Sequence, residues 1–249
     1  MKRGVALVTG AGHGIGAATA RMLAAEGYNI CVNYRADHDA AAAVVADCEA
    51  AGVRAVAVAA DVGDHGEVAR LFEECDAALG PITCLVNNAG IIGQASRLEE
   101  LTPERLMATF AVNTFGAFYC TQQAAARMST RKGGSGGAII NISSIAAALG
   151  SPNEYIHYAA SKGALETLTA GSGKELAPEG IRVNAIRVGT TNTRIHQTEG
   201  NPERPGKIAA LTPMGRIAEP EDIARAVVWL ASPGAAFITG TTITVSGGF

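Results

Sequence analysis

The fold is decided by a stretch near the N-terminus, residues 5–16, which reads VALVTGAGHGIG. Its first four residues, Val5–Val8, are apolar and predict a strand, while residues 15–26 predict a helix that ends at Gly27. The glycines between them allow the backbone to turn sharply and to approach a bound group closely. Because a helix N-terminus offers free N–H groups and a positive dipole end, the stretch predicts a pyrophosphate-binding loop.

The spacing of the glycines leaves one alternative open. The strict pattern G-x-G-x-x-G does not start at Gly10, and Gly12-x-Gly14-x-x-Ala17 meets only a looser form of it. A glycine-rich turn that binds nothing would look similar. The strand before the loop and the helix after it favour the binding loop.

The rest of the chain repeats this alternation of short apolar runs and helical stretches. Further strands are predicted at 30–33, 54–59, 84–87, 138–142, 182–186 and 242–245, and helices at 40–51, 66–79, from 103 onward, 155–176 and 223–230. Nearly continuous apolar strands are typical of a parallel sheet that is buried on both faces. The 249 residues contain no visible repeat or linker, so we expect residues 1–249 to form one α/β domain, a doubly wound parallel sheet with helices on both faces.

Composition restricts the class of partner. The net charge is −3 and no block of Lys and Arg occurs, which argues against nucleic acid and anionic membranes. No run of 18 apolar residues predicts a membrane span. The cysteines are odd in number and lack metal-ligand spacing, so we expect reduced core residues in a cytoplasmic protein and no metal site. They are Cys31, Cys48, Cys75, Cys84 and Cys120.

The end of the second predicted strand indicates which nicotinamide cofactor would bind. It reads Asn33-Tyr34-Arg35, and the first carboxylate after it is Asp37. An acidic side chain at this place bonds the ribose 2′-hydroxyl of NAD(H), whereas an arginine accommodates the 2′-phosphate of NADP(H). The sequence therefore favours NADP(H) over NAD(H), with a solvated loop arginine as the alternative interpretation of Arg35.

Tyr158 and Lys162 form a candidate acid–base pair. They lie four positions apart in a predicted helix and so share one face. An ammonium beside a phenol lowers the phenol pKa from its ordinary value of about 10, and an acid with a pKa nearer neutrality can transfer protons in catalysis. The pattern alone also fits a solvated helix pair. Tyr155 lacks such a partner because position 159 is alanine.

Several short motifs follow one another along the whole chain. They are Thr9-Gly10-x-x-x-Gly14-Ile15-Gly16, Asp61-Val62, Asn87-Asn88-Ala89-Gly90, Asn113, Ser143-Ser144, Tyr158-x-x-x-Lys162 and Gly247-Gly248. In this order they resemble the short-chain dehydrogenase/reductase family, particularly its tetrameric glucose dehydrogenases and 3-oxoacyl-carrier-protein reductases. The resemblance implies a Rossmann fold, a homotetramer, and hydride transfer between a nicotinamide cofactor and a carbonyl or alcohol.

The resemblance also implies the catalytic residues. Tyr158 would be the general acid in reduction and the base in oxidation. Lys162 would bind the nicotinamide ribose and lower the phenol pKa, and Asn113 would help carry a water between Lys162 and solvent. Of the two serines, Ser144 lies 14 residues before Tyr158 and fits the family spacing better than Ser143. Its hydroxyl would bind the substrate oxygen.

The implied cofactor site draws on most of the motifs. Asp61 and Val62 would flank the adenine, and residues 88–90 would line the cofactor ribose. The full predicted set is Gly10, His13, Gly14, Ile15, Gly16, Asn33, Tyr34, Arg35, Asp61, Val62, Asn88, Ala89, Gly90, Tyr158, Lys162, Thr191 and Thr193.

Two positions depart from the family pattern. Val188 stands where the family usually has proline, which rigidifies the turn that holds the nicotinamide carboxamide. Thr191 and Thr193 remain available for the carboxamide and the phosphate. His13 stands where many NADP-using relatives carry arginine or lysine, which removes one contact to the 2′-phosphate.

The substrate would be surrounded by residues 91–97, 145–157 and 190–213. Residues 192–213 are rich in proline, glycine, threonine and charges, and we expect a substrate-binding loop or lid there. Glu154 and His157 would slightly favour a hydroxylated substrate, but the preferred interpretation places them on the surface at a helix start. We expect Trp229 in the core or a subunit interface, and the apolar segment 237–249 at a subunit contact.

The alternative functions account less well for the motif residues and the chain length. A non-catalytic NADP(H)-sensing protein does not need the set Asn113, Ser144, Tyr158 and Lys162. An epimerase or dehydratase that uses the same tyrosine usually needs a longer chain. An NAD-dependent sugar or alcohol dehydrogenase differs only in the cofactor. The sequence favours an NADP(H)-dependent oxidoreductase that converts a carbonyl to an alcohol and back.

Overall fold

The structure, a computed structural model, describes residues 4–193 and 204–249. Its centre is a parallel seven-stranded sheet in the order β3-β2-β1-β4-β5-β6-β7. The strands are β1 (Val5–Val8), β2 (Asn29–Tyr34), β3 (Ala55–Ala59), β4 (Cys84–Asn87), β5 (Gly137–Ser144), β6 (Ile181–Val188) and β7 (Thr242–Val245). The predicted doubly wound parallel sheet is confirmed.

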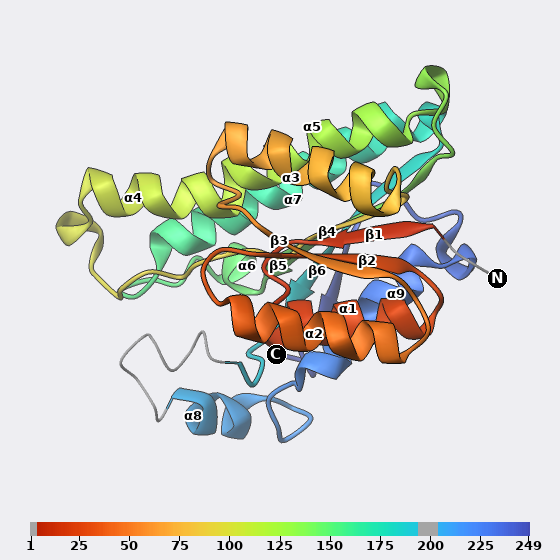
Figure 1. Cartoon of the computed structure of the whole chain (residues 1–249). Helices are drawn as coiled ribbons and strands as arrows, with labels where there is room; N and C mark the ends of the chain where they lie inside the picture. Colours follow the sequence, from red (N-terminus) through yellow and green to blue (C-terminus); the bar gives the residue numbers. More distant parts are fainter. Residues whose placement is uncertain (1–3, 194–203) are drawn as a thin grey trace.

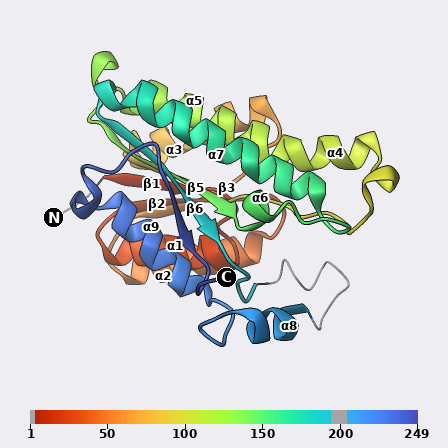
Figure 2. The same cartoon turned by 180° about the vertical axis from the view of Figure 1, so that it is seen from behind.

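Helices cover both faces of this sheet (Figures 1 and 2). One face carries α1 (Gly14–Ala25), α2 (His38–Ala50) and α9 (Pro220–Ala231). The other carries α3 (His65–Leu79), α4 (Pro103–Phe110), α5 (Gly116–Met128) and α7 (Ile156–Leu176). Of two short helices, α6 (Ala146–Leu149) follows β5, and α8 (Arg204–Leu211) precedes α9.

The apolar strands supply both cores because successive side chains in a strand point to opposite faces. In β1, Val8 packs among the residues of α1, α2 and α9, whereas Leu7 packs with Leu71 and Phe72 of α3. All four of these side chains are fully buried. The central strands are therefore apolar along their length, as expected for a sheet covered on both sides.

Short polar side chains fix where the helices begin. Asp37 accepts a hydrogen bond from the backbone N–H of Ala40 at the start of α2, and Asp64 caps α3 in the same way. Thr102 caps α4, whose first residue is Pro103. Each cap satisfies a backbone N–H that has no partner inside its helix.

Two elements differ from the sequence-based expectation. The long helix predicted from Pro103 is interrupted by one π-helical turn, Ala111–Phe115, between α4 and α5. The predicted loop at 192–213 contains α8, and its residues 194–203 lie outside the described part of the chain. The proline and glycine at 205 and 206 hide the helix from a propensity argument, although proline is tolerated in a first helical turn.

None of the helices in residues 4–193 and 204–249 combines the length and the apolar character that a bilayer crossing requires.

Candidate active site

Most of the predicted site residues lie at the carboxyl edge of the sheet, around the ends of β1, β4, β5 and β6. The chain order reverses at β1, which pairs with β2 on one side and with β4 on the other. In open parallel sheets this switch point leaves a crevice between the loops, where ligands bind.

The glycine loop at the end of β1 contains positions that favour or require glycine. Gly10 and Gly14 have φ angles of +61° and +51°. A Cβ on Gly16 would lie 2.5 Å from the Asn88 amide nitrogen and 2.5 Å from the Gly10 oxygen. Position 16 therefore requires glycine, while the next side chain toward the loop, Ile15, packs against the core. The loop leads directly into the N-terminus of α1, as predicted.

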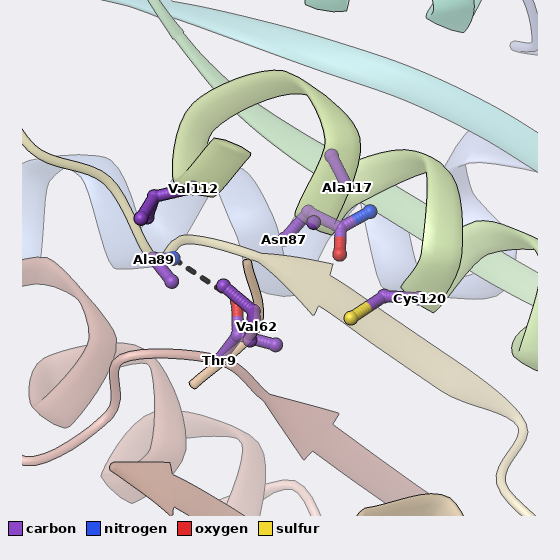
Figure 3. Close-up of a pocket in the computed structure, with 8 residues that line it drawn as sticks. Thr9, Val62, Asn87, Ala89, Val112, Ala117 and Cys120 are labelled. Carbon is purple, nitrogen blue, oxygen red and sulfur yellow. Dashed lines mark hydrogen bonds between the residues drawn. The ribbon is translucent and has the colours of Figure 1, made fainter. Parts of the chain in front are cut away.

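Thr9 and Asn88 join this loop to the loop after β4. The Thr9 hydroxyl oxygen accepts hydrogen bonds from the backbone N–H groups of Asn88 and Ala89, at 2.9 and 3.0 Å. In return, the Asn88 amide nitrogen donates to the carbonyl oxygens of Thr9 and Gly10. The two loops are thus held side by side, and Figure 3 shows the Thr9–Ala89 contact.

A small cavity of about 10 Å³ lies behind this contact (Figure 3). That volume is close to the smallest that holds one water, so the cavity is too small for a substrate. It is lined by Thr9, Val62, Asn87, Ala89, Val112, Gly116, Ala117 and Cys120.

Asn33 occupies the buried end of β2 and supports the glycine loop. Its side-chain oxygen accepts from the Gly10 N–H at 3.2 Å, and its amide nitrogen donates to the Val58 and Ala60 carbonyls. Because both ends of this amide are engaged within the protein, Asn33 holds the loop rather than presenting a free amide to a cofactor. Tyr34, next in the strand, is half-buried.

The residues after β2 place a histidine beside the first carboxylate. Arg35 is exposed, and Asp37 lies 2.7 Å from Nε2 of His13 on the glycine loop. Asp37 also caps α2. This carboxylate, whose charge would repel a phosphate, therefore faces an imidazole and a helix N-terminus, and the helix dipole favours negative charge there.

Asp61 and Val62 lie at the turn after β3. The Asp61 carboxylate accepts from the Gly63 N–H at 2.9 Å, and Val62 is buried against Gly116 of α5. The turn is further fixed because the Asp61 N–H donates to Glu67. Across the crevice, Thr191 is buried beyond β6 and Thr193 lies against Gly14 of the glycine loop.

Tyr158 and Lys162 meet on one face of α7. The Lys162 amine lies 5.8 Å from the centre of the Tyr158 ring, within the range of a cation–π contact. Lys162 is 4% exposed, and its Nζ donates to the Ile142 carbonyl of β5 at 2.7 Å. Burial lowers the pKa of Lys162 to about 8. A Cβ on Gly90 would lie 3.3 Å from this amine, so a side chain at position 90 would crowd it.

Asn113 lies in the π-helical turn and is buried. Its amide oxygen accepts from the Ile91 N–H, and its amide nitrogen donates to the Ile91 carbonyl, both at 2.8 Å. The same nitrogen donates to the Ser161 hydroxyl at 3.0 Å. Asn113 thereby ties the loop after β4 to α7, directly beside Lys162.

The two serines at the end of β5 have different surroundings. Ser143 is 2% exposed, and its hydroxyl donates to the Glu166 carboxylate at 2.8 Å. Ser144 is half-buried, and its hydroxyl oxygen accepts from the Ala146 N–H at 3.2 Å. Ser144 keeps its hydroxyl proton available for another acceptor, which supports the choice of Ser144 over Ser143.

His157 is a correction to the sequence-based interpretation. It was expected on the surface, yet it is 3% exposed and its Nε2 lies 3.0 Å from the Ile92 carbonyl. Burial lowers the pKa of His157, so the neutral imidazole is favoured. The reason is that the loop after β4 folds over the start of α7, and the Ser96 N–H bonds the Glu154 carbonyl there. No local sequence signal marks this contact.

No cluster of three or more histidine, cysteine or acidic side chains suited to a metal ion occurs in the part of the chain that the structure describes. Reactive groups at the crevice are instead a phenol, a buried amine and a hydroxyl, beside a loop shaped for a phosphate. These groups suit proton transfer next to a bound dinucleotide.

Comparisons with known proteins agree with this geometry. A family model described as Enoyl-(Acyl carrier protein) reductase matches residues 10–249. The uncharacterized oxidoreductase YgfF of Escherichia coli K12 is 45% identical, with 98% of this chain and 99% of the relative aligned.

Two solved structures are similar over nearly their whole lengths. The 3-ketoacyl-(acyl-carrier-protein) reductase from Brucella melitensis, complexed with NADH, is 33% identical with a TM-score of 0.90, covering 99% of this chain and 98% of that one. A blue fluorescent protein from a metagenomic library, in complex with NADPH, is 37% identical with a TM-score of 0.91, covering 100% and 98%.

Proposed function

The chain belongs to the short-chain dehydrogenase/reductase family and is an oxidoreductase that acts on CH–OH groups with NAD(P), and we propose that Tyr158 is its general acid and base, with NADP(H) as the preferred cofactor. The observation that carries the proposal is the contact between the Tyr158 ring and the buried Lys162 amine. This contact lies beside the loops that meet at the switch point of the sheet.

The residue types around the crevice support binding of a dinucleotide. A side chain at Gly16 would push apart the two loops that form the crevice, and one at Gly90 would press on the Lys162 amine. Helix α1 begins at Gly14 of the glycine loop, so its first N–H groups lie at this loop. In the proposed site, residues 10–16 hold the pyrophosphate, Asp61 and Val62 flank the adenine, and Lys162 binds the nicotinamide ribose. The cofactor, when bound, supplies or accepts a hydride at the substrate carbon.

The protein residues handle the proton and the oxygen. In reduction, Tyr158 gives its phenolic proton to the substrate oxygen as the carbon gains the hydride. The Lys162 ammonium stabilises the phenolate that remains, and Ser144 donates a hydrogen bond to the same substrate oxygen. Asn113 holds the loop and the helix that position these groups.

The preference for NADP(H) rests on the residues after β2. Arg35 is exposed and able to bind a 2′-phosphate, and Asp37 faces His13 at 2.7 Å. The two similar structures carry different cofactors, NADH in one and NADPH in the other, so the preference of this protein is argued from its own residues. Comparing kcat/KM for NADPH and NADH tests it, and a clear preference for NADH would overturn it.

We also propose a homotetramer in the cytoplasm. The exposed apolar side chains include one set on α4 to α5 and another from α9 to the C-terminus. A symmetric tetramer needs two kinds of two-fold contact, and we propose that one set contributes to each. The first set is Leu106, Met107, Phe115 and Phe118, and the second is Trp229, Phe237 and Phe249. Light scattering after size-exclusion chromatography measures the mass directly, and a monomer would contradict the assembly.

One experiment separates the candidate functions. NADPH fluorescence titration measures cofactor binding, and a panel of aldehydes, ketones, sugars and acyl thioesters measures turnover. Tight NADPH binding with no turnover of any carbonyl would indicate the sensing protein instead. Turnover that falls to background in Tyr158→Phe, with binding retained, is the result expected of the proposed enzyme. Residues 192–213 remain the proposed lid over the substrate.

A further inference from the structure

Glu166 lies on α7 one turn beyond Lys162, on the same side of the helix. Its carboxylate receives three hydrogen bonds from two strands. Oε1 accepts from the Ser143 hydroxyl at 2.8 Å and from Nε of Arg187 at 3.0 Å, and Oε2 accepts from Nη2 of Arg187 at 2.5 Å. One side chain on α7 thus binds β5 and β6 together.

These contacts occur one residue before Ser144 in β5 and one residue before the last residue of β6, Val188. Ser143 and Arg187 are directly paired across β5 and β6, and the next pair is Ser144 with Val188. Ser144 is the proposed substrate-binding hydroxyl. Val188 leads into the segment from Gly189 to Thr193, and its carbonyl accepts from the Ile145 N–H.

The geometry and the burial favour a rigid contact. Arginine and carboxylate form a two-point, charge-assisted interaction that fixes direction as well as distance. The Glu166 and Arg187 side chains are only 16% and 29% exposed, so solvent screens the pair less than it screens a surface pair. Ser143, at the third corner, is buried.

The same strand end lacks a restraint that a proline would supply. Val188 occupies the position where a ring would fix φ, and here the backbone is held by its pairing with β5 and β7 and, one residue earlier, by the Arg187 side chain. Arg187, held by Glu166, is the residue immediately before that position. The pair therefore anchors the strand where the missing ring would have stiffened it.

Resting on the proposed function, we infer that Glu166 is a positioning residue, which through Ser143 and Arg187 sets the placement of Ser144 and of the segment after Val188 relative to Tyr158. It touches neither substrate nor cofactor. Removing its carboxylate leaves the Ser143 hydroxyl and the Arg187 guanidinium to reorient, so the strand ends shift relative to α7. A displacement on the order of 1 Å in a reacting group reduces turnover about 100-fold.

The main test compares Glu166→Gln with Asp76→Asn as a matched control. Asp76 of α3 binds Arg127 of α5 at 2.6 Å, away from the crevice, and the two side chains are 32% and 18% exposed. We expect Glu166→Gln to lower kcat at least about 10-fold while the NADPH dissociation constant changes less than about 2-fold. The deuterium isotope effect on kcat with labelled NADPH should rise. Asp76→Asn should leave kcat and the isotope effect unchanged.

Two further variants keep the inference testable if Glu166→Gln does not fold. Ser143→Ala removes the hydrogen bond from β5 to Glu166, and Arg187→Lys keeps the charge but loses the two-point geometry. Both should lower kcat, by less than Glu166→Gln, at constant cofactor affinity. Equal kcat in all these variants and the wild type would overturn the positioning role.

A measurement without turnover separates this inference from the proposed function. Hydrogen exchange of the cofactor-free protein should speed up at residues 143–146 and 187–191 in Glu166→Gln and stay unchanged there in Asp76→Asn. If no substrate is turned over but exchange changes as expected, the proposed function fails while the contact stands. Unchanged exchange at both strand ends would overturn the role of Glu166 even in an active enzyme.

Discussion

Two regions of the interface between α7 and β5 treat buried polar groups differently. Deep in the sheet, the Asn87 amide donates to Asn141, Asn141 donates to Thr169, and Thr169 donates to the Leu165 carbonyl, so each group has its partner. At the carboxyl edge, two turns earlier in α7, the equally buried Lys162 amine makes one hydrogen bond among the described residues, to Ile142.

The difference separates polar groups that are fully hydrogen-bonded within the fold from an amine that is only partly hydrogen-bonded there. Buried polar groups with matched partners cost little and specify a unique packing. A buried amine with three donors and one acceptor is poorly solvated, and burial lowers the pKa of Lys162 to about 8. Such a group destabilises the free protein, and the proposed cofactor ribose would supply its missing partners.

The largest expected effect comes from a substitution at the carboxyl edge of the sheet that removes a catalytic group and leaves the hydrogen-bonded interior unchanged. Tyr158→Phe removes the proposed proton donor without changing the packing of the ring. We expect kcat to fall about 100- to 10,000-fold, because that is the usual contribution of a general acid. NADPH titration should show nearly unchanged binding. Near-normal turnover in this variant would remove Tyr158 from the mechanism.

The second prediction tests the cost of the buried amine. Lys162→Met should abolish most turnover and weaken cofactor binding, yet stabilise the cofactor-free protein. The lowered pKa corresponds to roughly 3 kcal/mol of destabilisation at neutral pH. Urea unfolding of the wild type and the variant at pH 7 measures the difference, and a less stable variant would contradict it.

The stability difference between the wild type and Lys162→Met should change with pH in a definite direction. Below about pH 8 the amine is protonated in both the folded and the unfolded wild type, so the cost is fully present. Between about pH 8 and the unfolded value near 10.5 the folded protein releases its proton first, and the wild type gains stability relative to the variant. Stability curves that stay parallel over this range would show that the amine is not desolvated.

The third prediction concerns the hydrogen-bonded polar groups in the interior of the sheet. Asn141→Ala leaves Asn87 and Thr169 without their shared partner and should destabilise the protein by about 2–3 kcal/mol. The change should not depend on pH, unlike that of Lys162→Met, and should have the opposite sign. Ser172→Ala is the control, because among the residues that the structure describes the Ser172 hydroxyl bonds only the Leu168 carbonyl of its own helix. Equal urea midpoints for the two variants would refute the distinction.

The smallest expected effect concerns an exposed polar group. Arg35→Ala should weaken NADPH binding about 10-fold, since a charge-assisted contact contributes about 1.5 kcal/mol, and leave NADH binding unchanged. Fluorescence titration with both cofactors measures the ratio. An equal loss for the two would mean that Arg35 does not read the 2′-phosphate.

Local sequence patterns predict the fold well because each element carries its own signal. The apolar runs that become β1 and β4, and the glycines that follow β1, need no knowledge of distant segments. The same holds for Tyr158 and Lys162, whose spacing within one helix already places them together. Helix α8 escaped prediction because proline and glycine at its start outweigh its short apolar part.

The residues that support the site depend on packing between distant segments. Glu166 meets Ser143 and Arg187 only when α7 lies across the ends of two strands, and nothing near Glu166 in the sequence announces them. His157 is buried because a loop more than 60 residues earlier folds over it. Asn33 could be named from its place at a strand end, but its engagement with Gly10 appears only in three dimensions.

The buried cysteines provide a way to measure local unfolding in the N-terminal half of the chain. All five are buried, on β2, α2, α3, β4 and α5, and burial raises the pKa of Cys84 and of Cys120 to about 12. Since only an accessible thiolate reacts, a maleimide added to the native protein should label these sites no faster than the surrounding elements come apart. The modification rate at each thiol would then measure how often the strand or helix that carries it opens to solvent.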